Sequence, residues 1–342
     1  MRQLSCNKEK IYLNSDFSKL HQIIPELLEK DVFYIIDESV YLLHSSKFSL
    51  LKNKILVSSL EKNKSISHVE VIINQLLKLN ANRKSFIIGI GGGVICDIVG
   101  FVSSIFMRGV DFGFIPTTLL SMTDASVGGK NGVNFNSIKN LIGVINDPKF
   151  IFIDYSFLKT LSNKEWLNGF SEIIKHACIC SVKLFNFLEN NSEIFKSYDT
   201  CENLAQFDQL VFDSISIKID YVQSDKNEIG QRKLLNFGHT FGHAIESKYS
   251  LTHGESVSLG IVFSNEIANS LKLLSLESNI RVRKLLSDYS LPINISSFDK
   301  QSLTNLIYKD KKSSKDKIDF IVLNKIGSAL IHSVKIKEIF NE

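Results

Sequence analysis

A glycine-rich turn at residues 89–94, Gly-Ile-Gly-Gly-Gly-Val, lies between an apolar run typical of a buried strand and a pattern typical of a helix. Glycine lets a ligand approach the backbone closely, and the amides at a helix N-terminus attract a pyrophosphate. The turn therefore indicates an α/β nucleotide-binding fold with a dinucleotide site. Val94 stands at the last glycine of the usual GxGxxG pattern, so the alternative of a tight turn without a ligand stays open.

Strand-like and helical segments alternate around this turn. Helical patterns at residues 69–77 and 94–106 flank the central strand, an order typical of a parallel α/β layer. We predict an N-terminal Rossmann-like α/β domain over residues 1–158. Its buried strands are expected at residues 32–36, 85–89, 112–115 and 150–153.

The second half of the chain has longer apolar periodicities. We predict a mainly α-helical C-terminal domain over residues 159–342, with two short strands at residues 317–323 and 329–334. The predicted helices cover residues 161–177, 182–195, 204–221 and 257–274.

Composition narrows the class of protein. With 342 residues, 44% of them hydrophobic and 22% charged, the chain suits a globular protein of about two domains. Five cysteines without CxxC spacing indicate neither a disulfide framework nor a thiolate zinc site. The start of the sequence lacks an apolar signal core, so we expect a cytoplasmic protein without a membrane partner. A net charge of +4 with scattered lysines argues against nucleic-acid binding.

Three of the eight histidines gather between residues 239 and 253, which points to a metal site. His239 and His243 stand four apart and share one face of a helix, and neutral imidazole is a preferred zinc ligand. Catalytic zinc usually takes three protein ligands, so His253 and a carboxylate are further candidates, and Glu172 is the best carboxylate. Spacing alone is a weak motif, and the alternative is that the histidines cap or line an amphipathic helix.

Other polar groups suited to an anionic ligand occur in both halves. Thr117 and Thr118 follow a predicted strand, and a turn at residues 124–130 joins a carboxylate to glycines and a lysine. A cleft needs only a few such groups to hold a small anion, although each alone is more often an ordinary solvated residue. The remaining candidates are Lys139, Asn140, Lys218, Glu228, Arg232 and Asn236.

Together these segments resemble the 3-dehydroquinate synthase family of sugar-phosphate cyclases, over about residues 37–312. The number of matches in the same order makes an accidental resemblance very unlikely. The matching segments are residues 91–94 with Asp97, 100–101, 108–109, 116–120, 124–134, Asn140, Glu172 with Lys175, 234–246, 253–255 and 310–312. The resemblance implies a dehydroquinate synthase-like fold and a phosphate-eliminating lyase of the shikimate pathway, which leads to chorismate and the aromatic amino acids.

The resemblance also implies two cofactors, NAD and Zn²⁺ or Co²⁺. Glu172, His239 and His253 would hold the metal, with His243 beside it as a polar or phosphate-contacting group. The helical domain would thus bind metal and substrate, and the α/β domain would bind NAD. The implied NAD contacts are Asp37, Glu61, Lys64, Gly91, Gly92, Gly93, Asp97, Thr117, Thr118, Lys130, Lys139, Thr160 and Leu161.

The implied substrate is 3-deoxy-D-arabino-heptulosonate 7-phosphate, whose carboxylate, hydroxyls and phosphate need separate recognition. By resemblance, the carboxylate would contact Lys218 and Arg232, with Asn236 nearby. The hydroxyls near the metal would be oriented by Asp124, Lys175 and Glu228. The phosphate would be surrounded by Lys130, Lys139, Asn140, His243 and one of Lys311 or Lys312, with Arg108 reaching it across a homodimer interface.

The implied reaction yields 3-dehydroquinate and phosphate. Transient oxidation by NAD makes a ketone that acidifies the neighbouring carbon, phosphate is eliminated, and the hydride is returned. Ring opening and an intramolecular aldol closure then complete the carbocycle, so NAD is used without net oxidation.

Three alternatives remain. A cyclase of the 2-deoxy-scyllo-inosose synthase type acts on a substrate without the carboxylate, and Lys218 with Arg232 argues against it. A metal-dependent polyol dehydrogenase would cause net reduction of NAD, and the residues predicted to bind phosphate argue against this alternative. A catalytically silent module is disfavoured because all three inferred metal ligands are present.

Overall fold

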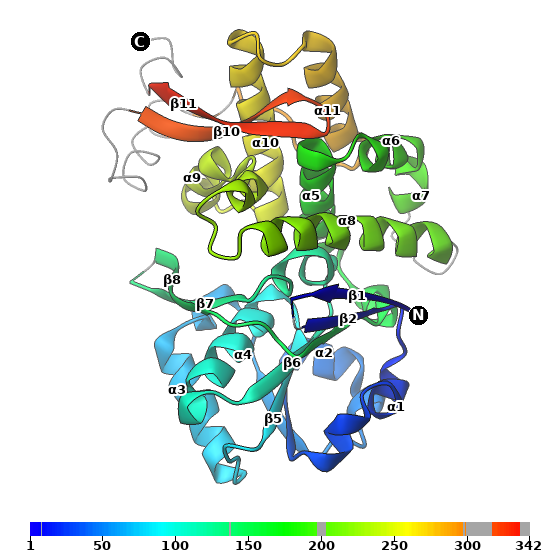
Figure 1. Ribbon diagram of the computed structural model, residues 1–342, viewed down its shortest axis with the longest axis vertical. Helices are drawn as coiled ribbons and strands as arrows, with labels where there is room; N and C mark the ends of the chain where they lie inside the picture. Colours follow the sequence, from blue (N-terminus) through cyan, green and yellow to red (C-terminus); the bar gives the residue numbers. More distant parts are fainter. Residues whose placement is uncertain (8, 137, 197–202, 297, 299–316, 336–342) are drawn as a thin grey trace. The chain divides into compact units, whose positions relative to one another are not determined.

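The computed structural model describes the chain except for residues 8, 137, 197–202, 297, 299–316 and 336–342. The chain divides into two compact units (Figure 1). The first unit holds Met1–Ser162 and Thr200–Gln223, and the second holds Asn163–Asp199 and Ser224–Glu342. A segment from the second half of the sequence, Thr200–Gln223, therefore belongs to the first unit.

The first unit is built on a seven-stranded sheet. In sheet order, the strands are β1 (Arg2–Cys6), β2 (Glu9–Leu13), β9 (Phe150–Phe152), β6 (Asp111–Pro116), β5 (Phe86–Gly91), β3 (Val32–Asp37) and β4 (Asn53–Val57). β1 and β2 pair antiparallel, and the other neighbouring strands of this sheet pair parallel. The four buried strands predicted from the sequence are confirmed as β3, β5, β6 and β9, and the parallel α/β class with them.

Alternate side chains of these strands point to opposite faces of the sheet. On one face, Tyr34 and Ile36 of β3 join a core with Phe48, Phe152 and Phe157. The other face is covered by α4, which packs against β3, β5 and β6. The helices of this unit are α1 (Leu20–Ile23), α2 (Glu38–Leu43), α3 (Ile66–Lys78), α4 (Gly93–Ile105) and α8 (Leu204–Ser224). Its short helical turns are η1 (Phe17–Lys19), η2 (Pro25–Glu29), η3 (Ser45–Phe48), η4 (Glu61–Asn63), η5 (Phe106–Arg108), η6 (Ser121–Ala125) and η7 (Tyr155–Thr160).

A separate hairpin also belongs to the first unit. β7 (Lys130–Phe135) and β8 (Ile138–Ile145) pair antiparallel and pack against α4. These strands were not predicted from the sequence, because glycine and asparagine interrupt the apolar alternation that marks a strand.

The second unit is mainly helical, as predicted. α5 is buried along most of its length and packs against α10. The predicted helix at residues 182–195 divides in two at Asn191, whose φ of −122° is not helical. The elements are α5 (Asn163–Cys180), α6 (Val182–Asn190), α7 (Ser192–Lys196), η8 (Gln231–Asn236), α9 (His239–Tyr249), α10 (His253–Ser270), α11 (Leu276–Asp288) and the predicted hairpin, β10 (Lys317–Lys325) with β11 (Ser328–Lys335).

Among the described cysteines, Cys96 and Cys178 are buried as free thiols. No helix in the described part of the chain combines the length and apolarity needed to cross a membrane.

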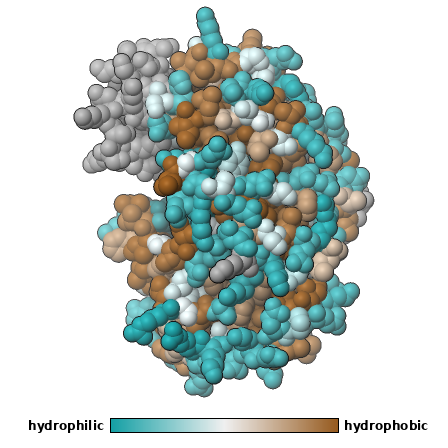
Figure 2. Space-filling model, in the orientation of Figure 1, coloured by the Kyte–Doolittle hydropathy of each residue, from teal (hydrophilic) through white to brown (hydrophobic). Residues whose placement is uncertain are grey.

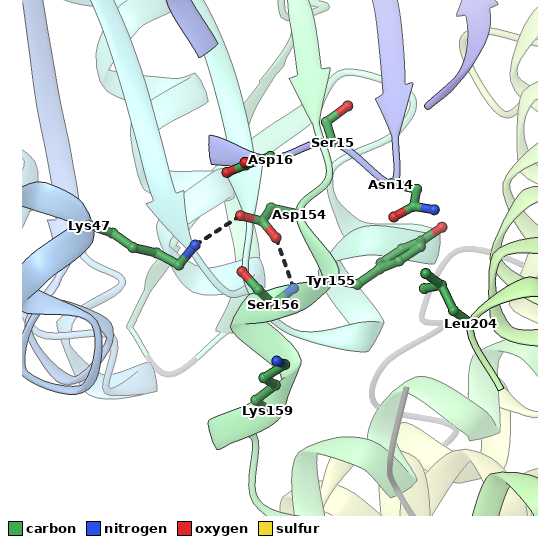
Figure 3. Close-up of a pocket in the computed structure, with 9 residues that line it drawn as sticks. All are labelled: Asn14, Ser15, Asp16, Lys47, Asp154, Tyr155, Ser156, Lys159 and Leu204. Atoms are coloured by element: carbon green, nitrogen blue, oxygen red, sulfur yellow. Dashed lines mark hydrogen bonds and ion pairs between the residues drawn. The ribbon is translucent and has the colours of Figure 1, made fainter. Parts of the chain in front are cut away.

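A pocket of about 320 Å³ lies in the first unit, beside the residues that follow β2 and β9 (Figure 3). Its central carboxylate, Asp154, is 5% exposed and accepts hydrogen bonds from the amides of Ser156 (2.8 Å) and Phe17 (3.1 Å) and from Lys47 Nζ (3.2 Å). Asp154 thus joins the start of η7 to η1. The lining residues include no predicted site residue; they are Asn14, Ser15, Asp16, Lys47, Asp154, Tyr155, Ser156, Lys159 and Leu204.

We expect Asp154→Ala to lower the midpoint of thermal unfolding by about 5 °C or more, because the loss of these bonds costs ~2–3 kcal/mol. Scanning calorimetry measures the shift. Lys159→Ala is the matched control, since Lys159 lines the same pocket with an exposed side chain and should shift the midpoint by less than about 1 °C. Equal shifts in the two variants would contradict the structural role of Asp154.

Candidate active site

The glycine turn leaves room for a ligand at the N-terminus of α4. β5 ends at Gly91, and Gly92 precedes α4 without any side chain capping its first amides. A Cβ on Gly91 would lie 2.6 Å from Ile95 Cγ1, so only glycine fits there. Thr117 donates its amide to the Gly91 carbonyl at 3.0 Å, and its buried hydroxyl has no hydrogen-bond partner among the described residues. Uncapped amides and an unsatisfied hydroxyl fit the phosphates of a dinucleotide.

Lys64 connects three segments next to this turn. Its side chain is 6% exposed, and Nζ donates to the carboxylate of Asp97 on α4 and to the amide oxygen of Asn140 on β8. Burial raises the pKa of Asp97, while the ammonium of Lys64 acts in the opposite direction. Three of the predicted site residues are therefore held in one hydrogen-bonded group.

A backbone irregularity directs Asn140 toward Lys64. The register of the hairpin shifts between Val133 and Phe135, and Asn140 has a left-handed φ of 54°. Its amide donates to Asn134 Oδ1 at 2.9 Å. Breaks in strand pairing, such as β-bulges, commonly redirect a side chain beside a functional site.

Asn134 is a positioning residue that the sequence analysis missed. Its amide donates to the Lys64 carbonyl (2.8 Å), and its Nδ2 donates to Glu61 Oε1 (2.8 Å). The hairpin is thereby attached to the segment that carries Glu61 and Lys64. Asparagines on both sides of Phe135 are the available signal, because asparagine favours turns and makes short-range hydrogen bonds.

The other predicted residues of the first unit have local partners. Asp37 caps α2 by accepting from Ser39, and the Thr160 hydroxyl lies 2.7 Å from His44 Nε2. Lys218 on α8 donates to Asp124 at 2.6 Å. The Thr118 hydroxyl forms a hydrogen bond with the Ser121 hydroxyl, and the Leu161 amide donates to the Leu158 carbonyl. The remaining predicted residues of this unit are exposed: Arg108, and Lys130 and Lys139 on the hairpin.

In the second unit, one carboxylate and two histidines meet. Glu172 comes from α5, while His239 and His253 are the first residues of α9 and α10. Glu172 Oε1 lies 3.1 Å from His253 Nε2 and 3.6 Å from His239 Nε2, and one potential ligand atom from each of the three residues lies within 4.8 Å of the others. Lys175, one turn further along α5, bonds the other oxygen of the Glu172 carboxylate. This donor set fits a divalent metal such as zinc.

The pKa of His239 supports that fit, while the pKa of His253 is shifted in the opposite direction. His239 Nδ1 lies 3.2 Å from the Phe237 carbonyl, so as a donor it leaves the Nε2 lone pair facing Glu172. Burial lowers the pKa of His239 to about 3, which keeps the imidazole neutral. For His253, burial lowers the pKa, but the bond to Glu172 outweighs it and the pKa is raised.

His243 lies beside this group and outside it. Its ring centre is 5.1 Å from that of His239, and its side chain is exposed. The group of three ligand atoms does not include it. The helical His239–His243 pair is therefore not the pair that faces Glu172.

The loop before α9 is organised by Asp225, a second residue that the sequence analysis missed. Its carboxylate accepts from the amides of Ile229 (3.1 Å), Gly230 (2.7 Å) and Arg232 (3.1 Å). The Arg232 side chain is buried and donates to the Lys226 carbonyl at 2.7 Å. The segment from Asp225 to Gly230 is rich in residues that favour turns, which is the signal that the sequence offered.

Two further predicted residues meet in the same loop. Asn236 on η8 donates to the carboxylate of Glu228, which has a left-handed φ of 57°. Lys311 and Lys312 lie outside the described residues.

Comparisons with known proteins match this chain over most of its length. The family model described as 3-dehydroquinate synthase N-terminal matches residues 54–168, and the model for the C-terminal part matches residues 169–313. The 3-dehydroquinate synthase of Campylobacter jejuni subsp. doylei is 40% identical over 311 residues, covering 86% of this chain and 88% of that protein.

Two solved structures share the fold. The 2-epi-5-epi-valiolone synthase of Streptomyces hygroscopicus subsp. jinggangensis, with NAD⁺ and Zn²⁺ bound, gives a TM-score of 0.87 at 24% identity and covers 99% of this chain and 96% of its own. A 2-deoxy-scyllo-inosose synthase, complexed with carbaglucose-6-phosphate, NAD⁺ and Co²⁺, gives 0.85 at 23% identity, with 99% and 97% covered. The fold is thus that of the sugar-phosphate cyclases. Within this class, the chain belongs to the 3-dehydroquinate synthase family.

We expect His239 to make the metal-free second unit less stable in acid. The folded pKa of about 3 lies below the unfolded value of 6.5, so between these values the unfolded chain binds the extra proton. Stability is therefore lost as pH falls below 6.5, by ~2 kcal/mol at about pH 5. Urea unfolding with chelator present, followed across this range, measures the slope.

His239→Gln should flatten this part of the pH profile. His332→Gln, at a partly exposed position on β11, is the control and should leave the slope unchanged. An unchanged slope in His239→Gln would show that another group controls the acid response.

Proposed function

We propose that this protein is a 3-dehydroquinate synthase that converts 3-deoxy-D-arabino-heptulosonate 7-phosphate to 3-dehydroquinate and phosphate. The observation that carries the proposal is the group formed by the buried Glu172 and the partly exposed His239 and His253. It occurs in a chain that is 40% identical to an enzyme of that name over most of both lengths. The two cyclase structures with the same fold support the broader reaction class.

The proposed cofactors are NAD and Zn²⁺ or Co²⁺. When bound, they supply a reversible hydride acceptor and a Lewis acid for one secondary alcohol. The turn at Gly91–Gly93 with Thr117 would hold NAD, and Glu172, His239 and His253 would hold the metal. We accordingly assign NAD binding mainly to residues 1–158, and metal and substrate binding mainly to residues 159–342.

The side chains around the metal group have separate tasks. Lys175 binds Glu172 Oε2, which leaves Oε1 for the histidine side. We assign the Lys175 ammonium to a hydroxyl of the substrate near the metal. Glu228, fixed by Asn236, can orient a second hydroxyl. Arg232 presents a permanent charge from a buried position and suits the substrate carboxylate.

Phosphate recognition is proposed for the hairpin, with Lys130, Lys139 and Asn140. Their contribution would be charge and hydrogen bonding at the leaving group, whose own oxygens would accept the proton from the neighbouring carbon. Arg108 is assigned to the phosphate site of a partner subunit. It follows Met107 in a turn where both have left-handed φ values, 66° and 49°, and such strain concentrates at functional sites.

Phosphate release and 3-dehydroquinate formation, measured together with NAD and zinc supplied, test the proposal. We expect equal amounts of both products, loss of activity with chelator, and no net NADH. Glu172→Gln should lower metal content and reduce kcat/KM by roughly a hundredfold or more, because it removes a charged ligand. Asn279→Ala, on α11, is the control for loss of a buried amide.

Other outcomes would identify an alternative. Turnover of a sugar phosphate without a carboxylate would favour the 2-deoxy-scyllo-inosose synthase type, and net NADH from a polyol would favour a dehydrogenase. Absence of all three activities in metal-loaded, NAD-bound protein would leave the silent module.

We also propose a cytoplasmic homodimer. The buried free thiols of Cys96 and Cys178 suit a reducing compartment. Apolar side chains gather on the surface over the β7–β8 hairpin (Figure 2), where Phe135, Ile138, Leu141 and Ile145 are each 44–55% exposed. An exposed apolar surface of this kind is typical of a protein interface.

Leu141→Glu should therefore shift the mass in solution from twice that of the chain toward 38.6 kDa. The reason is that a charge would be buried at the proposed interface. Light scattering coupled to size exclusion measures the mass. Leu50→Glu, at a position that is 93% exposed, should leave it unchanged. A monomeric parent protein would contradict the dimer.

A further inference from the structure

Asn131 closes the open end of the β7–β8 hairpin. Its side chain is buried, with 5% of the residue exposed, and Nδ2 donates to two carbonyls, those of Gly129 and Asn146, at 2.8 Å each. The Asn146 amide also donates to the Gly129 carbonyl at 2.8 Å. One side chain thus joins the entry into β7 to the exit from β8.

The same side chain lies against α4. A Cβ on Gly100 would stand 1.8 Å from Asn131 Oδ1, so the amide fits only over a glycine. Nearby, Asn146 Nδ2 donates to Ser104 Oγ (2.9 Å), and that hydroxyl donates to the Gly100 carbonyl (2.6 Å). The base of the hairpin is therefore fixed to the middle of the helix that begins at the glycine turn.

Lys130 lies between the two residues that this network holds. Gly129, with a φ of 68°, is fixed on one side, and Asn131 on the other. Lys130 itself is exposed. A fixed backbone on each side of a cationic residue lowers the ordering cost of anion binding, because the loop does not have to be immobilised when the anion binds.

We propose that Asn131 is a positioning residue that sets where Lys130 meets the substrate phosphate. The inference rests on the proposed function and extends it. Asn131 makes no contact with substrate; it acts through the backbone on each side of Lys130. Its loss should weaken anion binding more than it slows the chemistry of the bound complex.

The first experiment compares Asn131→Ala with the parent enzyme. We expect the KM for the heptulosonate phosphate and the inhibition constant of inorganic phosphate to rise about tenfold, with kcat within about threefold and metal content unchanged. A purely structural role predicts the opposite split, because partly unfolded protein lowers kcat at constant KM. Asn279→Ala, which also removes a buried amide, should leave both constants unchanged.

Gly100→Ala provides a second, independent variant. The added methyl group displaces the Asn131 amide, so we expect the same rise in KM. In the double variant Gly100→Ala/Asn131→Ala the two rises in KM should not add, because the Asn131 Oδ1 atom that clashes with the new methyl group is absent. Unchanged KM and phosphate inhibition in both single variants would overturn the proposal.

The test also separates this inference from the proposed function. If the parent protein forms no 3-dehydroquinate, the proposed function fails. Calorimetric titration with inorganic phosphate then decides the positioning role, which holds if both single variants bind about tenfold more weakly than the parent and fails if they bind equally well or the parent binds none.

Discussion

The buried carboxylate of Glu172 sets the arrangement of the second unit. A charge with a side chain only 1% exposed is costly unless both oxygens are bonded. Lys175 satisfies one oxygen, and the other faces His253 and His239. Three helices therefore bring specific residues to one point. The start of α10 is fixed by a capping box in which Thr252 and Glu255 bond each other's backbone, and by the Gly254 amide, which donates to Asn168 Oδ1 at 2.7 Å.

In the first unit, the parallel sheet performs the corresponding task. The carboxyl ends of parallel strands meet at one edge, so Gly91 and Thr117 become neighbours although they are far apart in sequence. Glycine at the turn and the uncapped start of α4 then present backbone amides at this edge. Lys64 links the β7–β8 hairpin to the same edge by a hydrogen bond to the side chain of Asn140. The two candidate sites are thus organised in different ways. A buried charge organises the candidate metal site in the second unit, and backbone geometry organises the candidate phosphate site in the first unit.

The features that could be predicted from the sequence are those that depend on local patterns of residues. The strands that became β3, β5, β6 and β9 are continuous apolar runs, and the glycine turn lies where it was expected. The pattern did not predict that α8 belongs with the first unit. That outcome depends on long-range contacts, such as Tyr155 with Asp208 and the Arg2 guanidinium over the Phe212 ring, which periodicity does not encode. Asp225 and Asn134 were missed because they act on backbone amides.

Left-handed backbone at Asn140, Glu228 and Arg108 shows how the site constrains its own sequence. Asparagine tolerates this conformation, but for glutamate and arginine it costs about 1 kcal/mol, and glycine would relieve the strain. The surrounding bonds hold it in place: Asn134 binds the Asn140 amide, and the three amides bound by Asp225 fix the loop of Glu228. Left-handed backbone also occurs at Lys272 and Ser290, which lie outside the predicted site. The role of Glu228 and Arg108 in substrate recognition therefore stays a proposal that their end groups, and not the strain, must justify.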